Sequence, residues 1–231
     1  MSFVTSLSSN AANATAPAQG CLTHARPVVF VVDDDVSVRE SLRLLIQSAG
    51  WQPELFASAR EFLARPPLPP TPSCLVLDVL LPGLNGLDLQ ERMAADRIEL
   101  PIIFVTGHGD VPTTVQAMKR GATEFLTKPF RDEVLITAIE HALERSTRTL
   151  DHADELRVLH QRYATLSRRE REVMLLVVAG LLNKQVGAEL GISEITVKVH
   201  RGRVMQKMQA NRLPALVNMA ACLQLTYRRG V

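Results

Sequence analysis

Several apolar stretches of the sequence are followed by side chains that could together hold a metal ion and a phosphoryl group. The run 74–77 is followed by Asp78, and an earlier apolar run is followed by three consecutive aspartates, 33–35. Two later runs lead to a hydroxyl at Thr106 and an amine at Lys128. Carboxylate oxygens are ligands that Mg²⁺ prefers, and phosphoryl transfer needs positioning and neutralised charge. The residue types therefore indicate phosphoryl chemistry, provided that the fold brings them together.

The elements around these residues predict that they do meet. Short apolar runs bounded by Pro and Gly are typical of buried parallel strands, and here they alternate with helical stretches. This pattern predicts an α/β fold made of βαβ units: a doubly wound, five-stranded parallel sheet. The carboxyl ends of its strands share the edge where open α/β sheets bind ligands. The predicted strands are 28–33, 53–56, 74–78, 101–106 and 124–127, and the predicted helices are 36–49, 58–64, 86–96, 111–120 and one that starts near Asp132.

Each aspartate taken singly would more commonly be a helix cap or a turn residue. The whole set, in this order and on successive strands, favours a functional site. The proline-rich stretch 66–72 cannot form a helix or a central strand, so we expect a stiff loop there.

The last third of the chain has a different character. Residues 165–231 contain 11 Lys+Arg and 4 Asp+Glu, a net charge of +7, although the whole chain carries only +2. Segments 183–190 and 194–208, separated by a turn at 191–193, have the layout of an all-α helix-turn-helix domain, with Ser193 as N-cap. This layout and the basic charge together predict DNA binding. The second segment is expected to have a cationic face made by Lys198, Arg201, Arg203 and Lys207. Ile195, Val199 and Met205 are expected to pack inward, although Val199 could also face outward.

The remaining segments define the predicted domain limits. Residues 1–26 are expected to be a disordered tail, 27–145 the α/β domain, 146–164 a helical linker and 165–231 the DNA-binding domain. A loose charged loop is the alternative within the linker. No apolar run reaches the roughly 20 residues of a membrane span and no secretory signal is recognised, so we expect a cytoplasmic protein without a membrane partner. Cys74 and Cys222 are expected to be small buried residues in a reducing compartment.

The motifs resemble two known families. Residues 27–145 resemble a two-component receiver domain, and residues 165–225 are similar to the DNA-binding domain of the LuxR/NarL class. Stretches 106–112 and 204–208 resemble the FixJ-like subgroup of that class. The matching residues are Val32-Asp33-Asp34-Asp35, Asp78 with Pro82-Gly83, Thr106-Gly107, Lys128-Pro129-Phe130, Leu166-Ser167-Arg168-Arg169-Glu170-Arg171-Glu172-Val173, Asn183-Lys184-Gln185 and Thr196-Val197-Lys198-Val199-His200.

The receiver resemblance implies a flavodoxin-like fold and a role for each residue at the sheet edge. Asp78 corresponds to the phospho-acceptor, and Asp33 and Asp34 to the acidic pair, with Asp34 a direct metal ligand. The implied cofactor is Mg²⁺, or another divalent cation such as Mn²⁺, held by Asp33, Asp34, Asp78 and the backbone carbonyl of Leu80. Such a receiver assists only its own phosphorylation and dephosphorylation and is not otherwise an enzyme.

The resemblance also implies a switch and a dimer. Thr106 and Lys128 correspond to the groups that bind the phosphoryl oxygens, and a cis peptide before Pro129 would fix the lysine. Thr106 and Phe125 correspond to the residues that move on phosphorylation. Val115 and Lys119, four residues apart on one predicted helix face, are the candidates for the dimer interface.

The implied protein is a phosphorylation-dependent transcriptional response regulator. A sensor histidine kinase would donate the phosphoryl group, and a homodimer would bind double-stranded promoter DNA and act on RNA polymerase. Lys198 and Val199 are expected to contact base edges. The residues expected at DNA phosphates are Lys184, Thr196, Arg201 and Arg203.

Two alternatives and three departures accompany this interpretation. A Mg²⁺-dependent phosphatase of the haloacid dehalogenase type also uses an aspartate nucleophile, and 33–37 nearly match its motif; a regulator that binds DNA without phosphorylation is the other alternative. Leu80-Leu81 stands where the subgroup often has Arg-Met. Gly187 replaces a usual alanine at an expected cost of roughly 1 kcal/mol. Gly202 stands where a side chain often contacts DNA.

Overall fold

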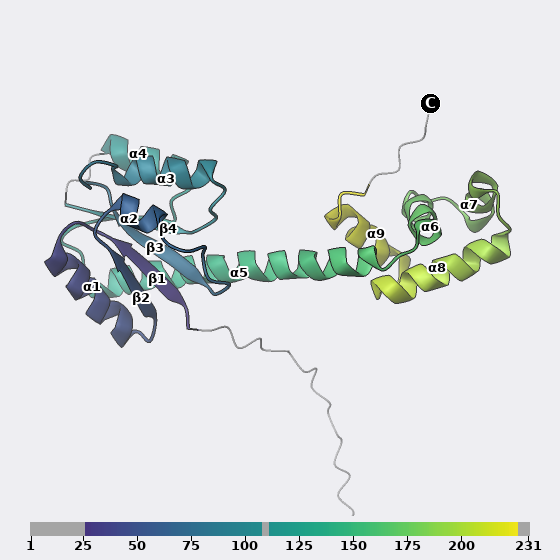
Figure 1. Ribbon diagram of the computed structural model, residues 1–231, viewed down its shortest axis with the longest axis horizontal. Helices are drawn as coiled ribbons and strands as arrows, with labels where there is room; N and C mark the ends of the chain where they lie inside the picture. The colour runs from purple at the N-terminus through teal and green to yellow at the C-terminus, as the bar shows by residue number, and fades with distance from the viewer. Residues whose placement is uncertain (1–25, 108–110, 226–231) are drawn as a thin grey trace, which may run out of the picture.

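The chain forms an α/β region and an all-helical region that are joined by one long helix (Figure 1). The computed structural model describes residues 26–107 and 111–225. The α/β region is a five-stranded parallel sheet of order β2-β1-β3-β4-β5, which confirms the predicted doubly wound fold. Its elements are β1 (Val28–Val32), α1 (Val36–Ser48), β2 (Gln52–Phe56), α2 (Ala59–Leu63), β3 (Ser73–Asp78), α3 (Gly86–Ala95), β4 (Ile102–Thr106), α4 (Val111–Lys119), β5 (Glu124–Thr127) and the first part of α5 (Asp132–Ala164).

The central strands β1, β3 and β4 are buried on both faces, because their side chains point alternately to the two sides of the sheet and helices cover each side. One face of β1 and β3, with Phe30 and Leu77, packs against α2, α3 and α4. The other face, with Val31 and Val76, packs against α1 and α5. Continuous apolar strands that are covered on both sides are the expected form of a parallel sheet, and they leave its carboxyl edge open for polar groups.

The predicted elements of the α/β region agree with the observed ones to within one residue at each described boundary. The proline-rich stretch 66–72 contains neither helix nor strand, as predicted. The predicted tail lies outside the described residues except for Arg26, and so do residues 108–110 of the stretch that resembles the FixJ-like subgroup. The prediction for Cys222 was wrong: this thiol is exposed on α9, whereas Cys74 is buried.

Helix α5 belongs to two hydrophobic cores. Near its start, Leu135 and Ile139 pack under the sheet. Near its end, Leu159 and Tyr163 pack against the helical region. The helix is unbroken across 146–164, so the charged loop considered as an alternative is not present, and it leads straight from one core to the other (Figure 1). The exact domain limits stay predictions.

The helical region contains the predicted helix-turn-helix. Its helices are α6 (Arg168–Val178), α7 (Asn183–Leu190), α8 (Glu194–Met208) and α9 (Leu213–Cys222). Ser193 caps α8, since its side chain accepts a hydrogen bond from the backbone N–H of Thr196. Gly187 has a packing reason: a Cβ there would lie 2.7 Å from the backbone oxygen of Ile192. The expected advantage of alanine is therefore reversed, because the turn needs this close approach.

The prediction of which side of α8 faces inward was partly wrong. Val197, Val204 and Met208 are buried, whereas Ile195 is 75% exposed and Val199 is 49% exposed. The helix carries apolar residues on opposite faces, so apolar spacing alone could not identify the buried one. No helix in the described part of the chain is long and apolar enough to span a membrane.

Candidate functional site

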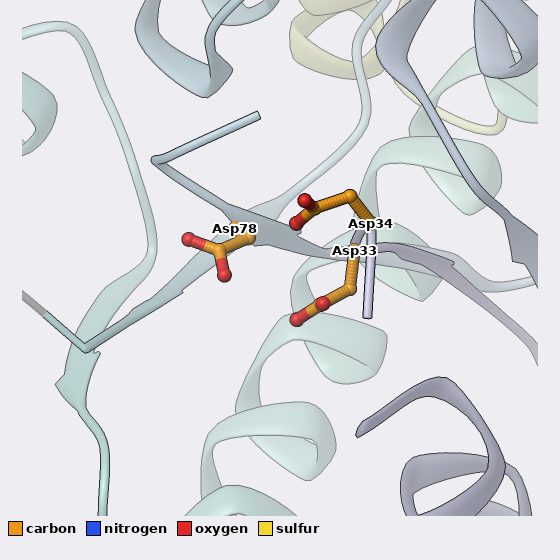
Figure 2. A group of neighbouring side chains, drawn as sticks. All are labelled: Asp33, Asp34 and Asp78. Atoms are coloured by element: carbon orange, nitrogen blue, oxygen red, sulfur yellow. The ribbon is translucent and has the colours of Figure 1, made fainter. Parts of the chain in front are cut away.

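Three carboxylates converge at the carboxyl edge of the sheet, as Figure 2 shows. Asp78 ends β3, and Asp33 and Asp34 directly follow β1, the neighbouring strand. The β1–β3 register pairs Val32 with Leu77, which brings Asp33 level with Asp78. Asp33, Asp34 and Asp78 each offer an oxygen, and these oxygens all lie within 4.8 Å of one another. Two of the three side chains are buried, so the cluster is a strong concentration of negative charge.

Lys128 partly offsets this charge. Its Nζ lies 2.7 Å from Oδ2 of Asp33 and 2.9 Å from Oδ2 of Asp78. Burial acts to lower the pKa of Lys128, but the hydrogen bonds and charges of the two aspartates outweigh it, and the pKa is raised overall. The side chain is therefore an ammonium at neutral pH. The peptide bond between Lys128 and Pro129 is cis, as the sequence suggested.

Backbone hydrogen bonds hold the carboxylates in place. Oδ1 of Asp78 accepts from the N–H of Leu80 at 2.9 Å, and Oδ1 of Asp33 accepts from the N–H of Asp35 at 2.9 Å. Asp35 is itself the N-cap of α1. The three consecutive aspartates thus have different roles: Asp35 is the cap that a single aspartate would most commonly be, and the other two belong to the cluster.

Arg39 is a contact of this site that the sequence did not reveal. Its Nη1 donates to the backbone oxygen of Asp33 at 2.6 Å and so braces the turn after β1. The residue lies in the second turn of α1, among other polar residues, and nothing in its spacing distinguishes it.

The donor set fits a hard divalent cation. Three carboxylates supply oxygen ligands, as Mg²⁺ requires, and one lysine leaves the cluster with a net negative charge. Nothing in the cluster offers the thiolate or imidazole ligands that Zn²⁺ and Cu²⁺ favour, whereas carboxylates suit both Mg²⁺ and Mn²⁺.

Of the other residues predicted for the α/β domain, Thr106 ends the strand beside β3, and Phe125, Val115 and Lys119 lie farther along the sheet, on β5 and α4. Thr106 is fully buried at the end of β4, and its backbone oxygen accepts from the N–H of Lys128 at 2.8 Å. Phe125 is half-buried on β5, with its ring centroid 6.1 Å from that of Phe104. Val115 and Lys119 are exposed on α4, which packs against β5. They form a second surface and do not contribute to the carboxylate cluster.

The residues predicted to contact DNA lie in the helical region, on α7 and α8. Lys198 pairs with Glu194 at 3.3 Å, and Nη1 of Arg201 donates to Oδ1 of Asn183 at 3.1 Å. Asn183 was named only as part of the matching motif; its bond to Arg201, which joins α8 to the start of α7, was not predicted. The remaining predicted contacts are Lys184 on α7 and Thr196, Val199 and Arg203 on α8.

Lys207 does not belong to the cationic face on which the sequence placed it. Its Nζ lies 2.6 Å from Oε2 of the buried Glu170 and donates to the backbone oxygen of Thr165 at 3.1 Å. The hydrogen bond from Lys207 holds the pKa of Glu170 below its ordinary value, against the opposing effect of burial. Lys207 therefore joins the end of α8 to the start of the helical region.

Comparisons with known proteins identify the families of the two domains. Residues 29–140 match the response regulator receiver domain, and residues 164–220 match the luxR family of bacterial regulatory proteins. The chain belongs to the response regulators that combine a receiver domain with a LuxR-type DNA-binding domain, and it is a transcriptional regulator of the FixJ-like kind.

The relatives match along most of their length. The chain is 50% identical to Nodulation protein W of Bradyrhizobium diazoefficiens over 90% of this chain and 92% of that protein. It is 45% identical to the transcriptional regulatory protein FixJ of the same species, over 83% of this chain and 93% of that protein. The solved structure of the response regulator StyR has a TM-score of 0.75 and 46% identity, over 85% of this chain and 99% of that one. Nothing among these matches supports the phosphatase alternative.

Proposed function

We propose that Asp78 accepts a phosphoryl group from a sensor histidine kinase and that this modification controls DNA binding in the cytoplasm. The observation that supports the proposal best is the arrangement at the sheet edge. Three carboxylates lie together, and Lys128 hydrogen-bonds to two of them. A nucleophile that is placed beside a cation suits phosphoryl transfer, which depends mainly on positioning and neutralised charge.

The residues of the chain have distinct tasks in this reaction. The Asp78 carboxylate attacks phosphorus, the P–N bond to the kinase histidine breaks, and the leaving imidazole takes up a proton. Asp33, Asp34, Asp78 and the Leu80 carbonyl would hold Mg²⁺, or another divalent cation such as Mn²⁺, whose charge offsets that of the phosphoryl oxygens. Lys128 and the Thr106 hydroxyl bind the transferred group.

Phosphorylation then changes the α4–β5 surface. The acyl phosphate shifts an existing equilibrium through Thr106 and Phe125, and a homodimer forms around Val115 and Lys119. The exposed apolar residues of α4 support this interface. Val111, Val115 and Met118 follow helical spacing and are 76%, 44% and 42% exposed.

The dimer places two copies of α8 in successive major grooves. Lys198 and Val199 contact base edges, and Lys184, Thr196, Arg201 and Arg203 contact phosphates. The hydrogen bond that Arg201 donates to Asn183 supports the phosphate role, because it holds this guanidinium toward α7 and away from the outer face of α8. RNA polymerase is the partner through which the DNA-bound dimer acts on transcription.

Acetyl phosphate tests the proposal without the kinase. The full chain is incubated with acetyl phosphate and Mg²⁺, and the phosphorylated form is resolved on a phosphate-affinity gel. We expect a shifted band that EDTA suppresses, that Asp78→Asn abolishes, and that the control Asp88→Asn retains, since Asp88 is exposed on α3. An equally strong band in Asp78→Asn would refute the assignment.

A further inference from the structure

The outer face of α8 carries an apolar pair that folding does not use. The buried face of this helix is supplied by Val197, Val204 and Met208, each at most 1% exposed. Ile195 and Val199 lie one turn apart on the outside and are 75% and 49% exposed. Neither belongs to a hydrophobic core of the described residues.

Helical geometry places this pair at the centre of the outer face. With about 100° of rotation per residue, positions 195, 199, 202 and 206 lie within about 60° of one another, opposite Val197 and Val204. At Gly202 a Cβ would meet nothing within 4 Å. The backbone of α8 is therefore open to close approach at the middle of this face, as a glycine allows.

Charged side chains flank the apolar pair. Arg201 is held toward α7 by Asn183, and Arg203 lies on the opposite flank. Lys198 pairs with Glu194, at the border between the outer face and the α7 side. A helix that lies in the major groove directs its flanks toward the two phosphate backbones and its centre toward the base edges. The apolar group that the base edges present there is the C5-methyl group of thymine.

We infer that Ile195 is a specificity-determining residue of this protein, and that Ile195 and Val199 contact the methyl groups of two thymines on neighbouring base pairs. The inference rests on the proposed placement of α8 in the major groove and adds a residue to the proposed contacts. Ile195 lies in the first turn of the recognition helix, where HTH proteins contact bases. Its exposure in the free protein is explained by this use on DNA.

Removing single methyl groups from the DNA tests the inference. Duplexes that the full chain prefers are selected in vitro from a random library, with the protein activated by beryllium fluoride. In the selected duplex each thymine is replaced by deoxyuridine, which deletes only the methyl group, at both half-sites together. Affinities are measured for the wild type, Ile195→Ala, Val199→Ala and the control Val217→Ala, which shortens an exposed valine on α9.

The wild type should lose roughly threefold to tenfold in affinity per methyl contact at two thymine positions. Ile195→Ala should lose a similar factor on the thymine duplex, become insensitive to uracil at one of these positions and stay sensitive at the other. Val199→Ala should show the complementary pattern, and Val217→Ala should match the wild type. Thermal unfolding should be the same for all four proteins because these side chains are exposed.

Two results would overturn the inference. If Ile195→Ala keeps the full wild-type sensitivity at every thymine, Ile195 contacts no methyl group and only the inference fails. If no sequence is enriched over random DNA, base recognition by α8 fails as well, and the inference falls together with the proposed function.

Discussion

The two functional regions of this molecule are built in opposite ways. At the sheet edge the side chains are mostly buried and bonded to one another: Asp33 and Asp78 are 2% and 8% exposed, and both accept from Lys128. On α8, Lys198, Val199 and Arg203 are exposed, and the pair Lys198–Glu194 is a contact within one helix, whereas Arg201 is bonded to another helix, through Asn183. The first region is a coupled unit, and the second is a set of nearly independent contacts.

The two regions should tolerate amino-acid substitutions to different degrees. A buried charge that loses its partner is costly, so the sheet edge permits few substitutions. Exposed residues on a helix that is held by its other face change stability little. DNA specificity can therefore vary on α8 while the phosphorylation chemistry stays the same.

The largest expected effect concerns association and would show whether the sheet edge controls the α4 surface. With beryllium fluoride the mass from light scattering should nearly double. Val115→Asp should keep the protein monomeric, because it places a charge in an apolar contact, and should leave phosphorylation intact. The same change at Val158, an exposed valine on α5, is the matched control and should still dimerise. If the mass does not change with beryllium fluoride, phosphorylation does not act by driving dimerisation through α4.

The next largest expected effect is on stability, and it distinguishes the buried pair of Lys128 and Asp33 from the exposed pair of Lys198 and Glu194. Lys128→Ala should destabilise the receiver by about 3 kcal/mol, since it leaves buried carboxylates uncompensated. A double-mutant cycle with Asp33→Asn should give a coupling of about 1–3 kcal/mol. The corresponding cycle of Lys198→Ala with Glu194→Gln should give less than about 0.5 kcal/mol.

The free energies of unfolding of the receiver variants are measured by urea unfolding. The fluorescence of Trp51 reports this transition, because Trp51 packs against the core between the sheet, α1 and α5. Far-UV circular dichroism during unfolding gives the free energies for the Lys198 and Glu194 variants on α8. Equal couplings for the two pairs would remove the distinction between the regions.

Lys207 should show that the DNA-binding domain also has one coupled pair. Lys207→Met should cost about 1.5 kcal/mol at pH 7, because a buried carboxylate loses a charged hydrogen bond. The pKa of Glu170 is lowered in the folded state, so this stabilisation is present above the unfolded pKa of about 4.3 and is lost as the pH falls through the folded value. The difference between variant and wild type should therefore shrink below about pH 4.

The control for Lys207 is Arg168→Met. Arg168 pairs with Glu172, but its side chain is 93% exposed, so the change should cost less than about 0.5 kcal/mol. A difference for Lys207→Met that persists undiminished in acid would exclude the Glu170 bond as its cause.

The smallest effect is expected from a single phosphate contact. Lys184→Ala should weaken binding to all sequences alike and lower the salt slope by about one. Lys198→Ala should instead cost roughly 1–3 kcal/mol at one base pair and change the preferred base. Salt titrations on the selected duplex and its single-base variants separate the two outcomes. If Lys198→Ala weakens binding to all sequences alike, Lys198 contacts a DNA phosphate and not a base.

The contrast between the regions also explains what the sequence could predict. Asp33, Asp78 and Lys128 were predictable because strand order and register bring strand ends together whatever the details of packing. Arg39 and the Glu170–Lys207 pair were not, since these contacts join positions whose spacing carries no signal. Ile195 was assigned to the wrong face because α8 is apolar on two sides, and only the packed structure decides which is buried.

The central claim is that Asp78 is the phospho-acceptor, and borohydride reduction tests it most directly. An aspartyl phosphate is reduced to homoserine, which peptide mass spectrometry locates to one residue. After treatment with acetyl phosphate and Mg²⁺, homoserine should appear at position 78, and it should be absent when acetyl phosphate is omitted. Homoserine at position 33, 34 or 35, with aspartate intact at 78, would contradict the account.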